Sequence, residues 1–169
     1  MEKAAILKEI IENRRSTFPK DYTDEEIEES VLTEILSSAN FAPNHKKTKP
    51  WRFKVFKGQE KADLGNKMAE IYRDTTRPEV FLEKKHASIS EKASKANAII
   101  AISVNFSGLV PEWEEIAATA MAVQNMYLTA SAYNVGAYWS SPGIIKHLDE
   151  FLGLEANQKC YGLFFLGRI

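Results

Sequence analysis

Two short segments of the sequence concentrate cationic and hydrogen-bonding side chains at points where a helix is expected to end. The first consists of Arg14, Arg15 and Ser16. Two guanidinium groups and a hydroxyl suit a phosphate, because arginine can bind phosphate oxygens in a bidentate manner. The same pair is also typical of the basic end of a surface helix, where positive charge favours the helix dipole. Taken alone, this segment does not predict a ligand.

The second segment, residues 42–53, is more specific. Its sequence is Ala-Pro-Asn-His-Lys-Lys-Thr-Lys-Pro-Trp-Arg-Phe. Pro43 and Pro50 restrict the backbone at both ends of an exposed loop. Asn44 can donate and accept hydrogen bonds, as the edge of a pyrimidine ring requires, and His45 could stabilise negative charge on such a ring. This pattern favours a binding loop over a solvated turn.

Two helices must position these segments. An apolar stripe predicts an amphipathic helix over residues 3–13, directly before the first segment. A second helix is predicted over residues 24–39, because Thr23 and Glu26 form a capping-box pattern at its start. Pro43 requires that this helix has ended before the loop.

The remaining elements alternate between strands and helices. Strands are predicted over residues 51–56, 98–104, 137–139 and 161–166, and helices over residues 59–76, 111–133 and 144–152. The continuous apolar run of residues 98–104 is typical of a central strand. Residues 77–95 fit either a mobile lid or a surface helix. Because the first two helices precede any strand, the order favours an α+β fold over a doubly wound sheet.

The helix after Pro111 is apolar nearly all round, which predicts that it is buried. Its side chains could pack in the core of one subunit or against a second subunit, and the pattern fits both. The residues that make it apolar are Ile116, Ala117, Ala118, Ala120, Met121, Ala122, Val123 and Met126.

Composition excludes several classes of protein. The 169 residues fit one domain spanning residues 1–169, and the net charge of −1 gives no basic field for nucleic acid. No apolar run reaches the length of a membrane span, and no secretory signal is recognisable. The single Cys160 suits a reducing cytosol, so a cytoplasmic location is expected. The sequence contains no dinucleotide-binding fingerprint, P-loop, serine-hydrolase elbow or metal-ligand spacing.

Together, the motifs at residues 14–16 and 42–53 resemble the nitroreductase family of FMN-dependent oxidoreductases, in particular its short members. The similarity continues through residues 136–143 and 162–167 and is weakest over residues 59–95. It implies an α+β domain with a central, mainly antiparallel sheet flanked by helices. It also implies a homodimer with two FMN sites built across the interface.

The resemblance assigns roles within each FMN site. Residues 14–16 fall on the motif for the phosphate and ribityl chain, and residues 43–45 on the segment that lies against the ring from the other subunit. Residues 139–141 match a segment after a strand that also touches FMN. Phe18 stands where the family often has a further cation, which Lys20 could replace. The cofactor-binding residues expected in this way are Arg14, Arg15, Ser16, Pro43, Asn44, His45, Trp139, Ser140, Ser141 and Arg168.

Arg168 is included because the chain ends at Ile169, whereas most family members extend well beyond the last strand. It is expected to supply the basic phosphate contact that relatives usually carry near that end.

The implied function is transfer of hydride from NAD(P)H, a transient donor, to FMN and then to a nitroaromatic, quinone or related small acceptor. One site would serve donor and acceptor in turn, in a ping-pong cycle. No acid or base is required, so no catalytic residue is assigned, and no metal, nucleic acid or membrane partner is expected. The alternatives are another FMN reaction (reductive dehalogenation or flavin fragmentation), flavin binding without turnover, and an interaction protein whose basic loop contacts an acidic partner.

Overall fold

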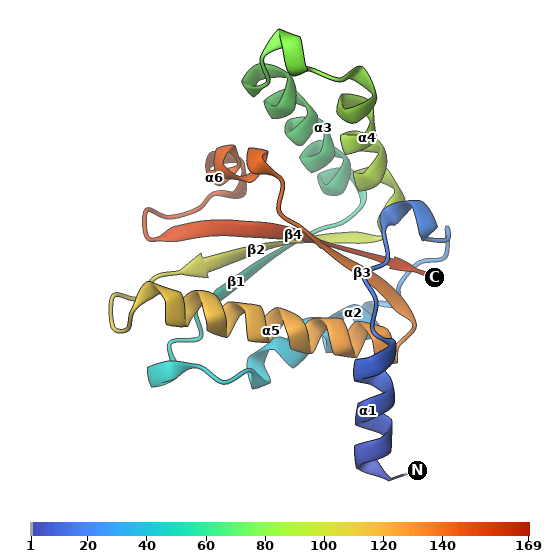
Figure 1. Ribbon diagram of the computed structural model, residues 1–169, viewed down its shortest axis with the longest axis vertical. Helices are drawn as coiled ribbons and strands as arrows, with labels where there is room; N and C mark the ends of the chain where they lie inside the picture. Colours follow the sequence, from blue (N-terminus) through green and yellow to red (C-terminus); the bar gives the residue numbers. More distant parts are fainter. Residues whose placement is uncertain (1) are drawn as a thin grey trace.

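The computed structural model describes residues 2–169 and has three layers, with a four-stranded sheet between two layers of helices (Figure 1). The strands are β1 (Trp51–Phe56), β2 (Ala98–Asn105), β3 (Val135–Ser140) and β4 (Gln158–Arg168). Their order is β1-β2-β4-β3, and each neighbouring pair is antiparallel. The predicted α+β fold with a central antiparallel sheet is confirmed.

The position of β2 inside the sheet accounts for its continuous apolar sequence. Successive side chains of a strand point to opposite faces, and both faces of β2 are covered. Ile100 and Ile102 belong to the core on one side of the sheet, whereas Ile99 and Ala101 belong to the core on the other side. Every second position is therefore apolar on each face, which gives a continuous apolar run.

One face of the sheet is covered by α5 (Glu112–Ala132) and α2 (Glu29–Ser38). The side of α5 that faces the sheet is buried and includes Ala118, Ala122 and Met126. Its other side is not buried, since Trp113 is 67% exposed and Met121 is 41% exposed. The helix therefore packs in the core of its own chain, as one of the two predictions has it, and packing of its exposed side against a second subunit stays a prediction.

The opposite face is covered by α3 (Gly58–Thr75) and α4 (Glu83–Lys95), which lie side by side above the sheet (Figure 1). A Cβ at Gly65 would lie 2.6 Å from the Cβ of Ala93, so glycine is what lets the two helices approach this closely. Residues 77–95, which fitted a lid or a surface helix, thus form one turn of 3-10 helix at Pro78–Val80 followed by α4.

Two predicted helices have different bounds. The second helix does not begin at residue 24, because residues 24–28 are not helical and α2 starts at Glu29. Here the N–H of Thr23 donates to the carbonyl of Arg168 (2.9 Å), and the Glu28 carboxylate pairs with the Arg168 guanidinium. These ties to the end of β4 replace the predicted capping box.

The helix predicted over residues 144–152 is divided into a 3-10 helix at Gly143–His147 and the short α6 (Asp149–Leu152). Each piece buries one apolar side chain, Ile145 and Leu152, and Leu148 between them is buried as well.

The first helix, α1 (Lys3–Asn13), forms as predicted but buries none of its side chains. It projects from the rest of the molecule beside the C-terminal end of α5 (Figure 1). Ile6, Leu7 and Ile11 are 41%, 54% and 50% exposed. Within residues 2–169 the apolar stripe of α1 therefore stays largely open to water, although the helix contacts α5.

Within residues 2–169, no helix is both long and apolar enough to cross a membrane.

Candidate functional site

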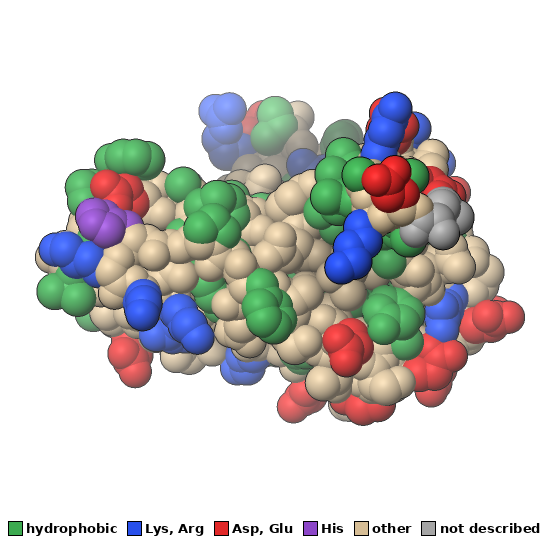
Figure 2. Space-filling view, turned by 90° about the horizontal axis from the view of Figure 1, so that it is seen from below, with side chains coloured by type: hydrophobic (Ala, Val, Ile, Leu, Met, Phe, Trp, Pro, Cys, Tyr) green, Lys and Arg blue, Asp and Glu red, His purple; other side chains and the backbone are tan. Residues whose placement is uncertain are grey.

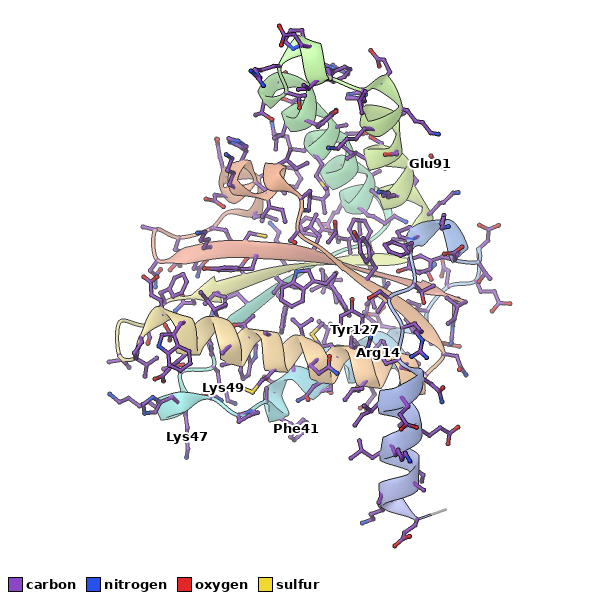
Figure 3. The ribbon with its side chains drawn as sticks, viewed as in Figure 1. Arg14, Phe41, Lys47, Lys49, Glu91 and Tyr127 are labelled. Carbon is purple, nitrogen blue, oxygen red and sulfur yellow. The ribbon has the colours of Figure 1, made fainter. Side chains whose placement is uncertain are left out.

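The two arginines at the end of α1 differ in their surroundings. Arg15 is exposed, and its Nη1 donates to the backbone carbonyls of Glu12 (2.5 Å) and Arg14 (3.0 Å), as a basic helix end does. Arg14 is half-buried, and its guanidinium carbon lies 5.1 Å from the centroid of the Tyr127 ring (Figure 3). Within residues 2–169 no carboxylate pairs with Arg14. Its charge is therefore available to an anion.

The chain after Arg15 runs along the edge strand β3. Ser16 forms a parallel β-bridge with Ala137, and the N–H of Thr17 donates to the Ala137 carbonyl (2.9 Å). Ala137 precedes Trp139 by two residues in the same strand. The structure thus places Ser16 beside the strand that carries Trp139, whereas Ser140 and Ser141 line hollows to which residues 14–16 do not contribute.

Tyr22 holds this edge in place. Its ring lies over Gly136 and Gly167, which are paired across β3 and β4, and a Cβ at Gly167 would lie 2.2 Å from the ring. Its hydroxyl lies within hydrogen-bond distance of the carbonyls of Thr17 (2.9 Å) and Phe165 (3.1 Å). Burial raises the pKa of Tyr22, so the phenol stays a donor. The two glycines are required by this close approach.

Trp139 has a structural role that the sequence did not reveal. Its backbone N–H donates to the Tyr127 hydroxyl (2.7 Å), and its indole N–H donates to the Tyr161 carbonyl (3.3 Å), at a bulge in β4. A Cβ at Gly162 would lie 1.9 Å from the indole nitrogen. The indole is therefore held by the sheet, and Tyr127 connects it to Arg14.

Ser140 opens onto a cavity of about 390 Å³ between the sheet and the helix pair α3–α4. The next residue, Ser141, lines a different, neighbouring hollow that shares Pro142 and Gly143 with the first. Several residues that line the first cavity have charged or hydrogen-bonding side chains. They are Tyr72, Thr75, Thr76, Lys85, Ser88, Lys92, Tyr138, Ser140, Lys146 and His147. Sequence reasoning missed this cavity. The only signal was the spacing of Lys85, Ser88, Ile89 and Lys92, which places them on one face of a helix.

The side chain of Asn44 holds the loop of the second predicted segment together through two hydrogen bonds. The Asn44 Oδ1 accepts the N–H of Lys49 (2.9 Å), and its Nδ2 donates to the Ala42 carbonyl (3.2 Å). One amide hydrogen and one lone pair of Asn44 remain for a ligand. Three residues of the loop have positive backbone φ angles, which residues other than glycine rarely adopt. They are Lys46 (50°), Lys47 (53°) and Lys49 (42°).

The loop is attached to the N-terminal end of α5. His45 Nδ1 lies 2.5 Å from Glu114 Oε2, and the Lys46 ammonium donates to the Leu109 carbonyl (3.0 Å). Glu114 and Tyr127 are separated by roughly 20 Å along α5, at about 1.5 Å per residue. In Figure 3, Arg14 and Lys47 lie near opposite ends of this helix. One chain therefore does not unite the two segments in a single pocket.

At two other positions where a contact to FMN was predicted, Arg168 and Phe18, the side chain contacts residues of its own chain. The Arg168 guanidinium donates to the Tyr133 carbonyl (2.9 Å) and pairs with Glu28. Phe18, at the position where a cation was expected, packs on Tyr138 with the ring centroids 4.5 Å apart. Lys20 is exposed on the turn that follows.

Comparisons with known proteins agree with this architecture. The model of the nitroreductase family matches residues 11–168. The Bacillus subtilis protein YfhC, to which an NAD(P)H nitroreductase activity is ascribed, is 27% identical over 159 residues, which cover 92% of this chain and 80% of YfhC.

Two crystal structures are similar at the same level of identity, 27%, and each comparison covers 96% of this chain and 85% of the other. A nitroreductase-like family protein from Bacillus cereus has a TM-score of 0.80. A protein from Desulfovibrio desulfuricans, solved in complex with FMN, has a TM-score of 0.71.

Proposed function

The chain belongs to the nitroreductase family, and on this basis we propose that it is an FMN-dependent oxidoreductase. It takes electrons from NAD(P)H and passes them to small acceptors such as nitroaromatic compounds or quinones. The observation that carries this proposal is the family match along residues 11–168, which includes both segments that the sequence singled out. We further propose that residues 1–169 form one domain and that the protein is cytoplasmic.

The side chains at the end of α1 fit the phosphate of FMN. Arg14 provides a planar, half-buried guanidinium with no carboxylate partner among residues 2–169, and Ser16 adds a hydroxyl beside β3. Such donors are well matched to phosphate oxygens. Arg15 can join them by giving up its bonds to helix carbonyls. Arg168 can join them only by leaving Glu28, so its contribution to FMN binding is smaller than that of Arg14.

The ring end of the site comes from the loop at residues 43–45 of a second chain. Within one chain this loop lies roughly 20 Å from Tyr127, measured along α5 with about 1.5 Å per residue. An isologous dimer with antiparallel α5 helices would bring the N-terminal end of one α5 to the C-terminal end of the other. The loop of each chain would then face Arg14 and Ser16 of its partner.

Exposed apolar side chains support such a dimer. They occur on α1, on the outer side of α5 and next to the loop, where Phe41 is 83% exposed. Figure 2, which views the molecule from the side of α1 and α5, shows several hydrophobic groups on this face. The residues concerned are Ile6, Leu7, Ile11, Phe41, Leu109, Trp113 and Met121. A second copy of the chain would remove them from water.

These contacts indicate which part of the reaction belongs to FMN and which to the protein side chains. When bound, FMN supplies the redox chemistry by accepting a hydride and returning electrons to an acceptor. The chain holds the phosphate through Arg14 and Ser16 and orients the ring through residues 43–45. Donor and acceptor occupy the same place in turn, so no separate dinucleotide-binding motif is needed. No side chain is required as an acid or base.

An absorption spectrum of the purified protein tests the proposal. We expect a yellow protein with the bands of oxidised flavin, which bleach when NADH or NADPH is added without oxygen and return when a quinone is added. A colourless protein that takes up no added FMN would contradict the proposal. A yellow protein that neither nucleotide bleaches would instead be a flavin-binding protein without this turnover.

A further inference from the structure

We propose that Glu114, in the first turn of α5, is a positioning residue for the flavin ring, because it holds His45 in the orientation in which the loop of residues 43–45 meets the ring. This inference rests on the proposed function, which assigns that loop to the ring of an FMN bound across a dimer. Glu114 acts through the imidazole of His45, whose Nδ1 lies 2.5 Å from Glu114 Oε2.

The contact with Glu114 leaves the other nitrogen of the imidazole available. A carboxylate oxygen accepts hydrogen bonds and donates none, so Nδ1 of His45 carries the hydrogen that lies between the two side chains. Nε2 has no hydrogen-bond partner among residues 2–169. The pyrimidine edge of a flavin offers an N–H donor and carbonyl acceptors, and Nε2 accepts when the imidazole is neutral and donates when it is protonated. Glu114 therefore presents one defined nitrogen to the ring.

The pair of His45 and Glu114 is open to water, which argues against a purely structural role. The two side chains are 57% and 24% exposed. Exposed ion pairs add little to the stability of a fold, because water screens the charges and both side chains lose freedom. The contact does restrict the imidazole, which otherwise samples several rotamers. Orientation of His45 is therefore the main consequence of this pair.

The neighbouring Glu115 has the structural role in the same helical turn. It is 1% exposed, and its two carboxylate oxygens lie 3.3 and 3.0 Å from the backbone nitrogen of Ser107. It thereby fixes the turn between β2 and α5, in which the Leu109 carbonyl accepts the Lys46 ammonium (3.0 Å). Consecutive residues of a helix point about 100° apart, so the first turn of α5 holds the loop from two directions.

The backbone of the loop needs such attachments. Three of its residues have positive φ angles, and conformations of this kind persist only where the surrounding structure holds them. His45 and Lys46 supply two contacts to the segment around the start of α5. A carboxylate in the first turn of a helix is itself favoured by the helix dipole, so Glu114 is a stable anchor for the imidazole.

Flavin binding separates this role from that of the phosphate end. In Glu114→Ala the imidazole of His45 loses its acceptor and is no longer held in one orientation. We expect FMN and riboflavin to bind more weakly by the same factor, about tenfold, because the two ligands share the ring. Glu114→Gln keeps an acceptor oxygen and should lose less. Fluorescence titrations with each flavin measure these affinities, and a loss confined to FMN would overturn the proposal.

A double-mutant cycle shows whether Glu114 acts through His45. If it does, Glu114→Ala should change flavin affinity no further in a protein that already carries His45→Asn, whereas independent roles would give additive losses and overturn the proposal. A matched control is Glu70→Ala on α3, which removes an exposed carboxylate that pairs with Lys67 (3.0 Å). This control should bind both flavins as the wild-type protein does.

Nuclear magnetic resonance of the imidazole tests the positioning without flavin. Long-range 1H–15N spectra of the same protein freed of flavin, recorded about two pH units above the ordinary pKa of histidine, show which ring nitrogen carries the hydrogen. The His45 signal, assigned by its loss in His45→Asn, should be that of the Nδ1–H form and should change in Glu114→Ala. An unchanged signal would overturn the proposal.

The two kinds of measurement also distinguish the possible failures. A wild-type protein that binds neither flavin would refute the proposed function, and the role of Glu114 with it. Normal flavin binding by the wild-type protein, with the same affinity in Glu114→Ala, would refute the positioning role alone.

Discussion

Arg14 combines partial burial, an aromatic platform and the absence of a carboxylate partner among residues 2–169. We expect Arg14→Ala to weaken FMN binding at least about tenfold, because a charge-assisted contact to phosphate is lost. Riboflavin, which lacks the phosphate, should bind both proteins equally. Flavin fluorescence titrations measure these affinities.

Lys8→Ala is a suitable control for this variant, because Lys8 is also a cation on α1 but pairs with Glu12 (3.8 Å). Equal affinity of Arg14→Ala and wild type for FMN would remove Arg14 from the site.

Asn44 closes a loop in which three lysines have positive φ angles. We expect Asn44→Ala to destabilise the protein by about 1 kcal/mol through loss of the two hydrogen bonds of the amide, and to weaken FMN binding as the loop loosens. Asn44→Asp keeps the acceptor for the Lys49 N–H and should lose less. Denaturant unfolding and flavin titration measure the two effects. An Asn44→Ala protein with unchanged stability would show that the proline residues alone define the loop.

The side chains of the site could be recognised from the sequence only where residue types were distinctive. The phosphate-binding types at residues 14–16 and the Pro-Asn-His loop were identified, whereas the lysines of the cavity were not. Lys85 and Lys92 lie seven residues apart in a charged helix, and Lys146 lies beyond two further strands. Only the folded chain shows that they line one cavity.

The edge formed by β3 and β4 depends on the packing and hydrogen bonding of Tyr22. The folded-state pKa of Tyr22 is raised, first by burial and then by Tyr127 and Asp21. A raised pKa means that the stabilisation is complete below the unfolded value of about 10 and is lost as the pH rises above it. We expect the midpoint of urea unfolding to fall with pH in that alkaline range.

The variant Tyr22→Phe should be less stable at neutral pH by about 1 kcal/mol and should show a shallower alkaline loss. An identical pH profile for Tyr22→Phe and wild type would contradict the role given to the phenol. Gly167→Ala should displace the Tyr22 ring without changing any titrating group, since its Cβ would lie 2.2 Å from that ring.

The elements were predictable where local pattern and tertiary structure agree. The strand β1 and the helix α1 have the predicted bounds, and β2 is the central strand that its apolar run indicated. The start of α2 was not predictable, because Arg168 at the far end of the chain holds Thr23 and Glu28. A capping box between Thr23 and Glu26 is a local preference that these distant contacts override.

The arrangement of the whole chain gives the strongest argument for a shared site. Two segments that resemble the halves of one FMN site lie at opposite ends of α5, and apolar side chains remain exposed along α1 and α5. The sequence indicated the two halves and the apolar helix. It could not show their separation, which depends on how α5 lies between them.

A complementation experiment tests the shared site most directly. Arg14→Glu removes the phosphate end, and Asn44→Ala/His45→Ala removes the ring end, so each homodimer should lack FMN. If each site takes one half from each chain, unfolding and refolding an equimolar mixture should restore FMN to about one quarter of all sites, since half of the dimers are mixed and each has one intact site. FMN content of the dimer fraction, measured by absorbance, should therefore rise from near zero to that level. A refolded mixture that binds no more FMN than its two parents would contradict a site built from two chains.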